Sequence, residues 1–116
     1  MIVNVDLSFM YDHNVVIHCE TKKQSDELIE AIVNYFDVYE DRACDWRVTW
    51  NKYKKSTCHR FNLHDDGTIT YGFCNIEWYI GDGKRVVEYS TLTTVIDYGE
   101  IESGFSSNAD ALYALL

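Results

Sequence analysis

The sequence predicts an α+β domain: a mostly antiparallel β-sheet with one main amphipathic helix packed on one face, and a short C-terminal helix. Three observations predict it. Apolar and polar residues alternate over several short segments, which is typical of half-buried strands. Residues 28–36 instead repeat their apolar side chains at helical spacing. Two of the strand segments flank a short turn that contains glycine, which is the pattern of a β-hairpin.

Length and charge restrict the domain organisation and the class of partner. With 116 residues, 47% of them hydrophobic, the chain is expected to form a single domain over residues 1–116. Its formal net charge of −9 speaks against direct contact with nucleic acid or an anionic membrane, and favours a basic protein as partner. Neither a signal peptide nor a membrane helix is recognisable, so we expect a cytoplasmic protein whose four cysteines stay reduced.

The N-terminal segment predicts two strands. Apolar residues alternate with polar ones from Val3 to Phe9, and residues 11–14 supply turn chemistry. Val15 to Cys19 reads as a second strand, which we expect to form a hairpin with the first.

A capping box predicts the start of the main helix. The Thr21 hydroxyl can accept a hydrogen bond from the backbone three residues on, and the Gln24 side chain can reach back. The apolar side chains that follow lie at helical spacing and predict one buried stripe. They are Leu28, Ile29, Ile32, Val33 and Phe36.

Beyond this helix, residues 37–45 read as a polar, acidic connection. Trp46, Val48 and Trp50 alternate with polar residues, which predicts a strand extending to Tyr53. The acidic connection is either a solvated surface or a contact for a basic groove.

A hairpin over residues 57–74 is the clearest local signal. Gly67 is available for the left-handed turn position. A three-residue loop over 65–67 places Cys58 directly opposite Cys74. The side chains expected on the other face, toward the helix, are Phe61, Leu63, Ile69, Tyr71 and Phe73.

The remaining chain predicts three further strands and one helix. The strands are expected at Ile76–Ile80, Val86–Tyr89 and Thr91–Tyr98. Asn108 can cap a final short helix. Its apolar side chains are Ala111, Leu112, Leu115 and Leu116.

The cysteines are candidate ligands of a structural zinc ion, which needs four nitrogen or sulfur donors in a tetrahedron. The predicted ligands are Cys19, Cys44, Cys58 and Cys74. Cys58 and Cys74 would supply two of them from one face of the hairpin, and a histidine can replace either of the others. The alternative is that these thiols simply pack in the core.

The sequence offers little support for catalysis. Neighbouring strand residues point to opposite faces, so neither Cys58 with His59 nor His18 with Cys19 can act as a nucleophile and its base. No catalytic motif is recognisable, and we expect a protein that is not an enzyme. Its tryptophans and tyrosines are core residues or interface anchors.

Several short blocks occur in an order that resembles a group of small proteins of phages and mobile elements in Firmicutes. The blocks are Val16–Thr21, Trp50–Tyr53, Thr57–Arg60, Ile69–Tyr71, Ile76–Tyr79 and Arg85–Tyr89. In particular, the chain resembles zinc-containing anti-CRISPR proteins of type II-A. That resemblance implies a Cas9 recognition lobe as partner, hindered loading of target DNA, and zinc among the cysteines and histidines. Because Cys44 lies outside the blocks, a histidine is its rival as fourth ligand.

Two classes of function follow from the sequence. One is an inhibitor that binds Cas9 without catalysis. The alternative is a small structural or regulatory protein of a phage, a binding module with no effect on Cas9.

Overall fold

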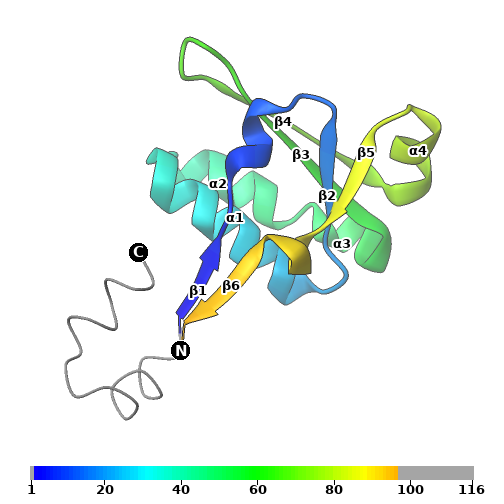
Figure 1. The fold of residues 1–116 in the computed structure, drawn as a ribbon, viewed down its shortest axis with the longest axis horizontal. Coiled ribbons are helices and arrows are strands. Elements are labelled where there is room, and N and C mark those ends of the chain that lie inside the picture. The colour runs from blue at the N-terminus through cyan, green and yellow to red at the C-terminus, as the bar shows by residue number, and fades with distance from the viewer. Residues whose placement is uncertain (1, 97–116) are drawn as a thin grey trace.

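The computed structural model describes residues 2–96 and confirms the α+β architecture (Figure 1). Six strands, four α-helices and three short 3₁₀ helices (η) make up this part of the chain. In order they are β1 (Ile2–Val5), η1 (Ser8–Tyr11), β2 (Val15–His18), α1 (Lys22–Phe36), α2 (Glu40–Arg47), α3 (Trp50–Tyr53), η2 (Lys54–Ser56), β3 (Thr57–Leu63), β4 (Ile69–Asn75), α4 (Ile76–Gly81), β5 (Arg85–Glu88), η3 (Tyr89–Leu92) and β6 (Thr93–Ile96). The expected C-terminal helix, capped by Asn108, lies outside the described residues.

Four strands form the main sheet in the order β4-β3-β2-β5. The β4-β3 and β3-β2 pairs are antiparallel, whereas β5 runs parallel to β2. The sheet is therefore mixed, with a long crossover between its two parallel strands, as parallel pairing requires.

The predicted hairpin between the first two strands is wrong. β1 pairs instead with β6, in a separate antiparallel ribbon that brings residue 2 opposite residue 96. After β1, the Asp6 carboxylate accepts a hydrogen bond from the Ser8 backbone N–H at 2.9 Å, and the chain turns into η1. β2 already has β3 on one side and β5 on the other, so it offers β1 no edge.

Helix α1 follows the prediction closely. The Gln24 N–H donates to the Thr21 hydroxyl at 3.2 Å, and the Gln24 side chain accepts from the Glu20 N–H at 2.8 Å. The box thus closes one residue earlier than a standard capping box. Leu28, Ile29 and Ile32 are fully buried against the sheet.

The β3-β4 hairpin is also confirmed, including its register. Cys58 lies opposite Cys74, and the His64 N–H donates to the Thr68 carbonyl at 2.9 Å across the turn. Gly67 has a φ of 86°, a left-handed conformation that favours glycine.

Two predicted strands and one predicted connection are helices. Residues 40–47 and 50–53 form α2 and α3 in place of the acidic connection and the strand ending at Tyr53. The alternation of Trp46, Val48 and Trp50 wrongly predicted a strand. Val48 is 57% exposed, whereas Trp46 and Thr49, one helical turn apart, are buried. Residues 76–81 form α4 because the Asn75 side chain accepts from the Trp78 N–H at 2.8 Å and caps a helix.

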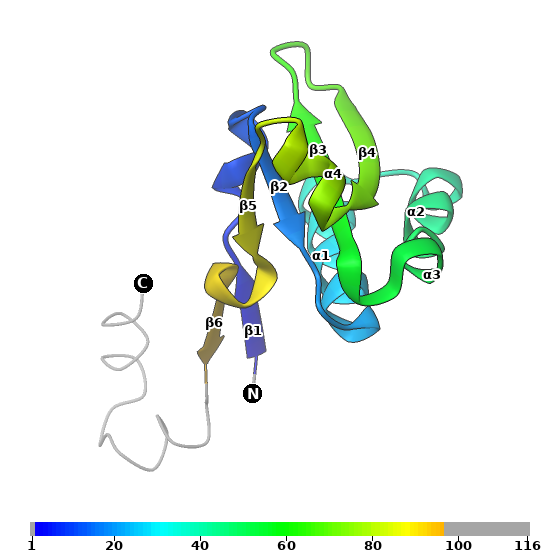
Figure 2. The same cartoon turned by 90° about the vertical axis from the view of Figure 1, so that its right-hand side faces the viewer.

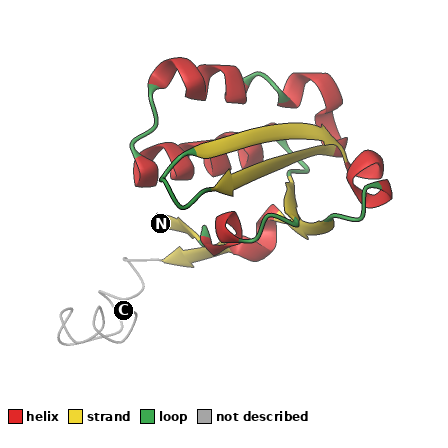
Figure 3. Cartoon of the chain, turned by 90° about the horizontal axis from the view of Figure 1, so that it is seen from above, coloured by secondary structure: helices red, strands yellow, loops and turns green. Residues whose placement is uncertain are grey.

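The two faces of the sheet carry separate apolar clusters. Residues of α1 and Trp46 of α2 pack with Phe61 and Ile69 on one face. Helix α4 lies over the other face (Figure 2). Its Tyr79 packs there against Val16 and Cys58. Seen from above, helices lie on more than one side of the hairpin (Figure 3). No helix within residues 2–96 is long and apolar enough to cross a lipid bilayer.

Candidate functional site

The hairpin brings two of the four predicted zinc ligands together and leaves the other two apart. Cys58 and Cys74 are paired across β3 and β4. His18 is the partner of Cys58 on β2, so the next residue, Cys19, faces the opposite side, where it is buried in the α1 core. Cys44 is exposed on α2.

The described fold therefore does not bring all four predicted ligands to one point. Burial raises the pKa of the Cys58 thiol to about 12 and raises that of Cys19 even further, so both are protonated in the metal-free fold at pH 7. Among the side chains that the structure describes, no three histidine, cysteine or acidic residues are grouped so as to hold a metal ion. The zinc prediction therefore rests on the resemblance, and metal analysis of the purified protein tests it.

A serine and a histidine meet inside the core. The Ser25 hydroxyl lies 2.7 Å from His59 Nε2, which is the separation expected of a nucleophile and its base. Both residues have no exposed surface, however, and they lie between α1 and the sheet. This placement makes the pair part of a structural network.

The direction of every hydrogen bond in this network can be worked out from one end. The Thr49 hydroxyl donates to the Trp46 carbonyl at 2.8 Å, so it accepts from the Tyr71 hydroxyl at 2.7 Å. Tyr71 has then used its hydrogen and accepts from His59 Nδ1 at 2.7 Å. His59 Nε2 is left as the acceptor for Ser25.

This chain of donors requires a neutral histidine with its proton on Nδ1. Desolvation in the core lowers the pKa of His59 to about 4, which keeps the ring neutral at pH 7. The network links α1, α2 and the hairpin through groups that would otherwise be buried without partners.

His18 forms a second set of hydrogen bonds between distant segments, and these require a charged ring, unlike that of His59. Its Nδ1 lies 2.6 Å and 2.7 Å from the two carboxylate oxygens of Glu88, and its Nε2 lies 2.5 Å from the Lys55 carbonyl oxygen. Both partners are acceptors, so both ring nitrogens carry hydrogen. Burial alone would lower the pKa of His18, but these hydrogen bonds and the nearby carboxylates raise it overall. The imidazolium joins β2, β5 and η2.

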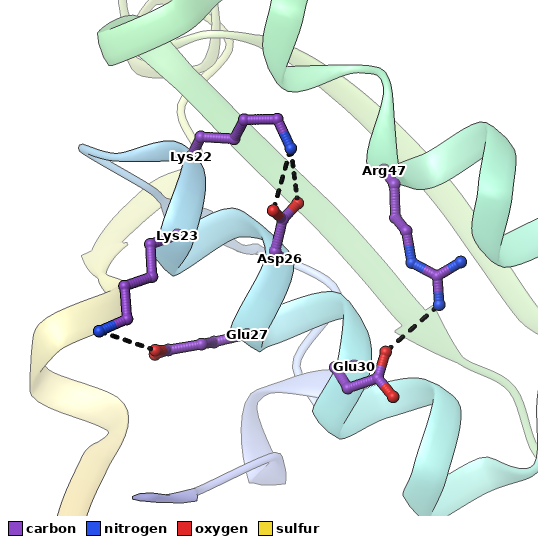
Figure 4. Close-up of a pocket in the computed structure, with 6 residues that line it drawn as sticks. All are labelled: Lys22, Lys23, Asp26, Glu27, Glu30 and Arg47. Atoms are coloured by element: carbon purple, nitrogen blue, oxygen red, sulfur yellow. Dashed lines mark hydrogen bonds and ion pairs between the residues drawn. The ribbon is translucent and has the colours of Figure 1, made fainter.

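A shallow hollow of about 630 Å³ lies beside α1, but its charges cancel. Figure 4 shows three cations and three carboxylates paired around it. The pairs are Lys22–Asp26 at 2.9 Å, Lys23–Glu27 at 3.9 Å and Arg47–Glu30 at 3.2 Å. A surface that is neutralised in this way has no electrostatic preference for an ionic ligand.

A second groove, of about 610 Å³, is lined by exposed tyrosines. Tyr11 of η1 and Tyr35 of α1 are 72% and 75% exposed. Val5, Leu7 and Phe36 contribute apolar surface, and the lining is completed by Asn4, Asp6, Ser8 and Thr94. We call these nine residues the tyrosine groove. They include one carboxylate and neither lysine nor arginine.

The same end of α1 leads into an acidic turn. Asp37 ends the helix in a left-handed conformation with a φ of 54°, and Tyr39 is 86% exposed. Asp45 is exposed on α2. The sequence flagged the acids of this segment, but it gave no sign that Tyr11 and Tyr35, 24 residues apart, border one groove.

Comparison with protein-family models, with curated proteins and with solved structures found no match for this chain.

Proposed function

We propose that this protein is a non-enzymatic anti-CRISPR inhibitor that binds a type II-A Cas9 in the bacterial cytoplasm and hinders loading of target DNA. The proposal joins the resemblance of the sequence blocks to one observation, the tyrosine groove beside an acidic turn. The partner surface would be the recognition lobe, which guides nucleic acid with basic side chains.

Exposed tyrosines suit a protein interface. Tyrosine supplies a large, rigid contact area and is among the residues most often found as interface hot spots. Tyr11 and Tyr35 flank a groove that apolar side chains also line, so a partner side chain inserted there would lose its contact with water on several sides. The groove is therefore a reasonable centre for an interface.

The surrounding charge suits a basic partner. Arginine and lysine side chains that bind phosphate can bind carboxylates instead, with charge-assisted hydrogen bonds. Asp37 ends α1 and Asp45 is exposed on α2, and the net charge of −9 would steer the whole protein toward a basic surface. Residues 97–116 add Asp97, Glu100, Glu102 and Asp110 and contain no lysine or arginine.

A binding role without catalysis agrees with the chemistry of the interior. Ser25 and His59 have hydrogen-bonding geometry but no exposed surface, and the chain of donors uses both as structural groups. A substrate has no route to them while the core is intact.

The decisive experiment titrates the protein into guide-loaded Cas9 and measures target-DNA binding. Loss of DNA binding near equimolar ratio supports the proposal. Unchanged DNA binding together with unchanged cleavage refutes it and leaves the phage binding module, whose partner a pull-down would identify.

Variants of the groove make this test specific. Tyr35→Ala and Tyr11→Ala should each weaken inhibition about tenfold or more, the usual loss at a hot spot. Trp78→Ala is the matched control, because Trp78 is an aromatic residue of α4 with 56% exposure outside the groove. Equal effects of all three variants would place the interface elsewhere.

Charge reversal tests the electrostatic part separately. Asp45→Lys should slow association with Cas9, and the effect should shrink as salt is raised. Asp65→Lys, in the hairpin turn, makes the same charge change far along the chain and serves as control. If inhibition survives reversal at Asp45 and throughout residues 97–102, the electrostatic mechanism is wrong.

A further inference from the structure

Cys58 and Cys74 are the one pair of cysteines that the described fold places directly opposite each other. They are partners in the antiparallel register of β3 and β4, between the pairs Thr57–Asn75 and His59–Phe73. Both side chains lie on the α4 face of the sheet, in contact with the cluster of Val16 and Tyr79.

The Cα separation of such a pair lies within the range that a disulfide spans. The His64 N–H donates to the Thr68 carbonyl, and hydrogen-bonded pairs recur at every second position of the hairpin, so Cys58 and Cys74 form such a pair. The Cα atoms of a hydrogen-bonded pair are about 5.5 Å apart. Disulfides span Cα separations of about 4.4–6.8 Å. Cys19, by contrast, faces the α1 core, and Cys44 is exposed on α2. The Cα separation therefore permits a bridge across the hairpin, and the other two thiols lack a similarly placed partner in the described fold.

The two thiols differ in their access to solvent, and this difference determines which of them reacts first. Cys58 is fully buried, whereas Cys74 is partly exposed, with its Sγ 3.9 Å from the Tyr53 hydroxyl. A dissolved reagent meets Cys74 first. Cys58 then lies next to it as the resolving thiol.

We propose that Cys58 and Cys74 form a dithiol site that low-molecular-weight disulfides such as oxidised glutathione convert to an intramolecular disulfide. The Cys74 thiolate attacks one sulfur of oxidised glutathione, and one molecule of reduced glutathione leaves. The Cys58 thiol then loses its proton and attacks the Cys74 sulfur of the mixed disulfide, which releases a second reduced glutathione. The protein loses two electrons and two protons, and oxidised glutathione gains them.

The new bond would fasten the hairpin at the end remote from its turn. It would link the strand that carries His59 to the strand that carries Tyr71, close to the point where α4 begins. We expect oxidation to raise the melting temperature by about 10 °C, because closing a loop of this length restricts the unfolded chain. Dithiothreitol should reverse the rise.

The experiment uses the full-length reduced protein, incubated with oxidised glutathione, alkylated to block the remaining thiols and digested with trypsin. Cleavage after Lys55, Arg60 and Lys84 puts Cys58 in residues 56–60 and Cys74 in residues 61–84. The two peptides remain joined only through a disulfide. We expect the linked species, with a mass about 2 Da below the sum of the reduced peptides.

Cys44→Ala should leave the linked species unchanged, whereas Cys74→Ala should abolish it; far-ultraviolet circular dichroism verifies that both variants fold. Three outcomes would overturn the proposal. One is a stable glutathione adduct on Cys74 with no linked peptides. Another is a disulfide that includes Cys19 or Cys44 as the main product. The third is a wild-type protein that keeps all its thiols.

Discussion

Removing one oxygen atom should unbalance the whole polar network between α1 and the hairpin. Tyr71→Phe deletes a hydroxyl that accepts from His59 Nδ1 and donates to Thr49, each at 2.7 Å. Thr49 keeps its bond to the Trp46 carbonyl, but His59 Nδ1 is left buried without a hydrogen-bond partner. An unsatisfied buried donor or acceptor costs about 1–3 kcal/mol.

We therefore expect Tyr71→Phe to lower the free energy of unfolding by about 2 kcal/mol and the melting temperature by about 10 °C. Urea titration followed by circular dichroism at pH 7.5 measures the first quantity, and a thermal scan measures the second. Tyr35→Phe makes the same chemical change at a 75% exposed position and should alter stability by less than about 0.5 kcal/mol.

A second observable checks the cause. Nitrogen chemical shifts of wild-type His59 should show a proton on Nδ1 and none on Nε2 at pH 7. Replacing both partners, as in the double variant His59→Phe with Tyr71→Phe, should cost less than the sum of the single changes, since no polar group is then stranded. Stability of Tyr71→Phe within about 0.5 kcal/mol of wild type, or a proton on Nε2, would refute the reasoning.

Three other properties of the described fold can be measured. Folding lowers the pKa of His59 from about 6.5 to about 4, so between these pH values the unfolded chain binds a proton that the folded protein does not. The free energy of unfolding of wild type should therefore fall by up to about 3 kcal/mol as pH is lowered from 6.5 to 4. His59→Gln should lose less stability over that range than His13→Gln, a control at an exposed site. Folding raises the pKa of His18, so its bond to Glu88 stabilises the protein at low pH and loses that effect as pH rises through the folded-state pKa. Glu88→Gln should therefore destabilise the protein more at pH 6 than at pH 9. An equal loss of stability at both pH values would exclude a charged His18. If the resemblance holds for metal, elemental analysis should find about one zinc per chain, whereas zinc-free protein that folds and ignores chelators would end that prediction.

The parts of the fold that the sequence predicted are those with local signals. Thr21 and Gln24 mark the start of α1, and the three-residue turn at 65–67 fixes the hairpin register down to the Cys58–Cys74 pair. The same alternation rule places His59 on the face of Phe61, so a buried polar group on that face was within reach of sequence reasoning.

Residues 46–53 were ambiguous for a physical reason. Trp46, Val48 and Trp50 satisfy a period of two, and Trp46, Thr49 and Trp50 satisfy a helical repeat equally well. Burial of the polar residue Thr49 is not predictable from the sequence, because it depends on hydrogen bonds of its hydroxyl to the Trp46 carbonyl and to Tyr71 inside the core. Only the packing of the finished fold decides between the two patterns.

Features that join distant segments left no sequence signal. The His18–Glu88 bond spans 70 residues, and β1 meets β6 across nearly the whole described chain. The spacing of the four cysteines did not show how they lie in the fold, where strand alternation sends Cys19 and Cys58 to opposite faces of the sheet.

The parallel pairing of β2 with β5 also bears on how the protein is made. During synthesis, residues 15–18 emerge long before residues 85–88, so β2 waits with one unpaired edge while α1 and the hairpin can already fold. That edge belongs to Val15, Val16 and Ile17, all essentially buried in the final structure, and an apolar open edge invites association between chains. A product that stops before residue 85 should therefore aggregate in the cell, whereas one that includes β5 should be recovered folded more often.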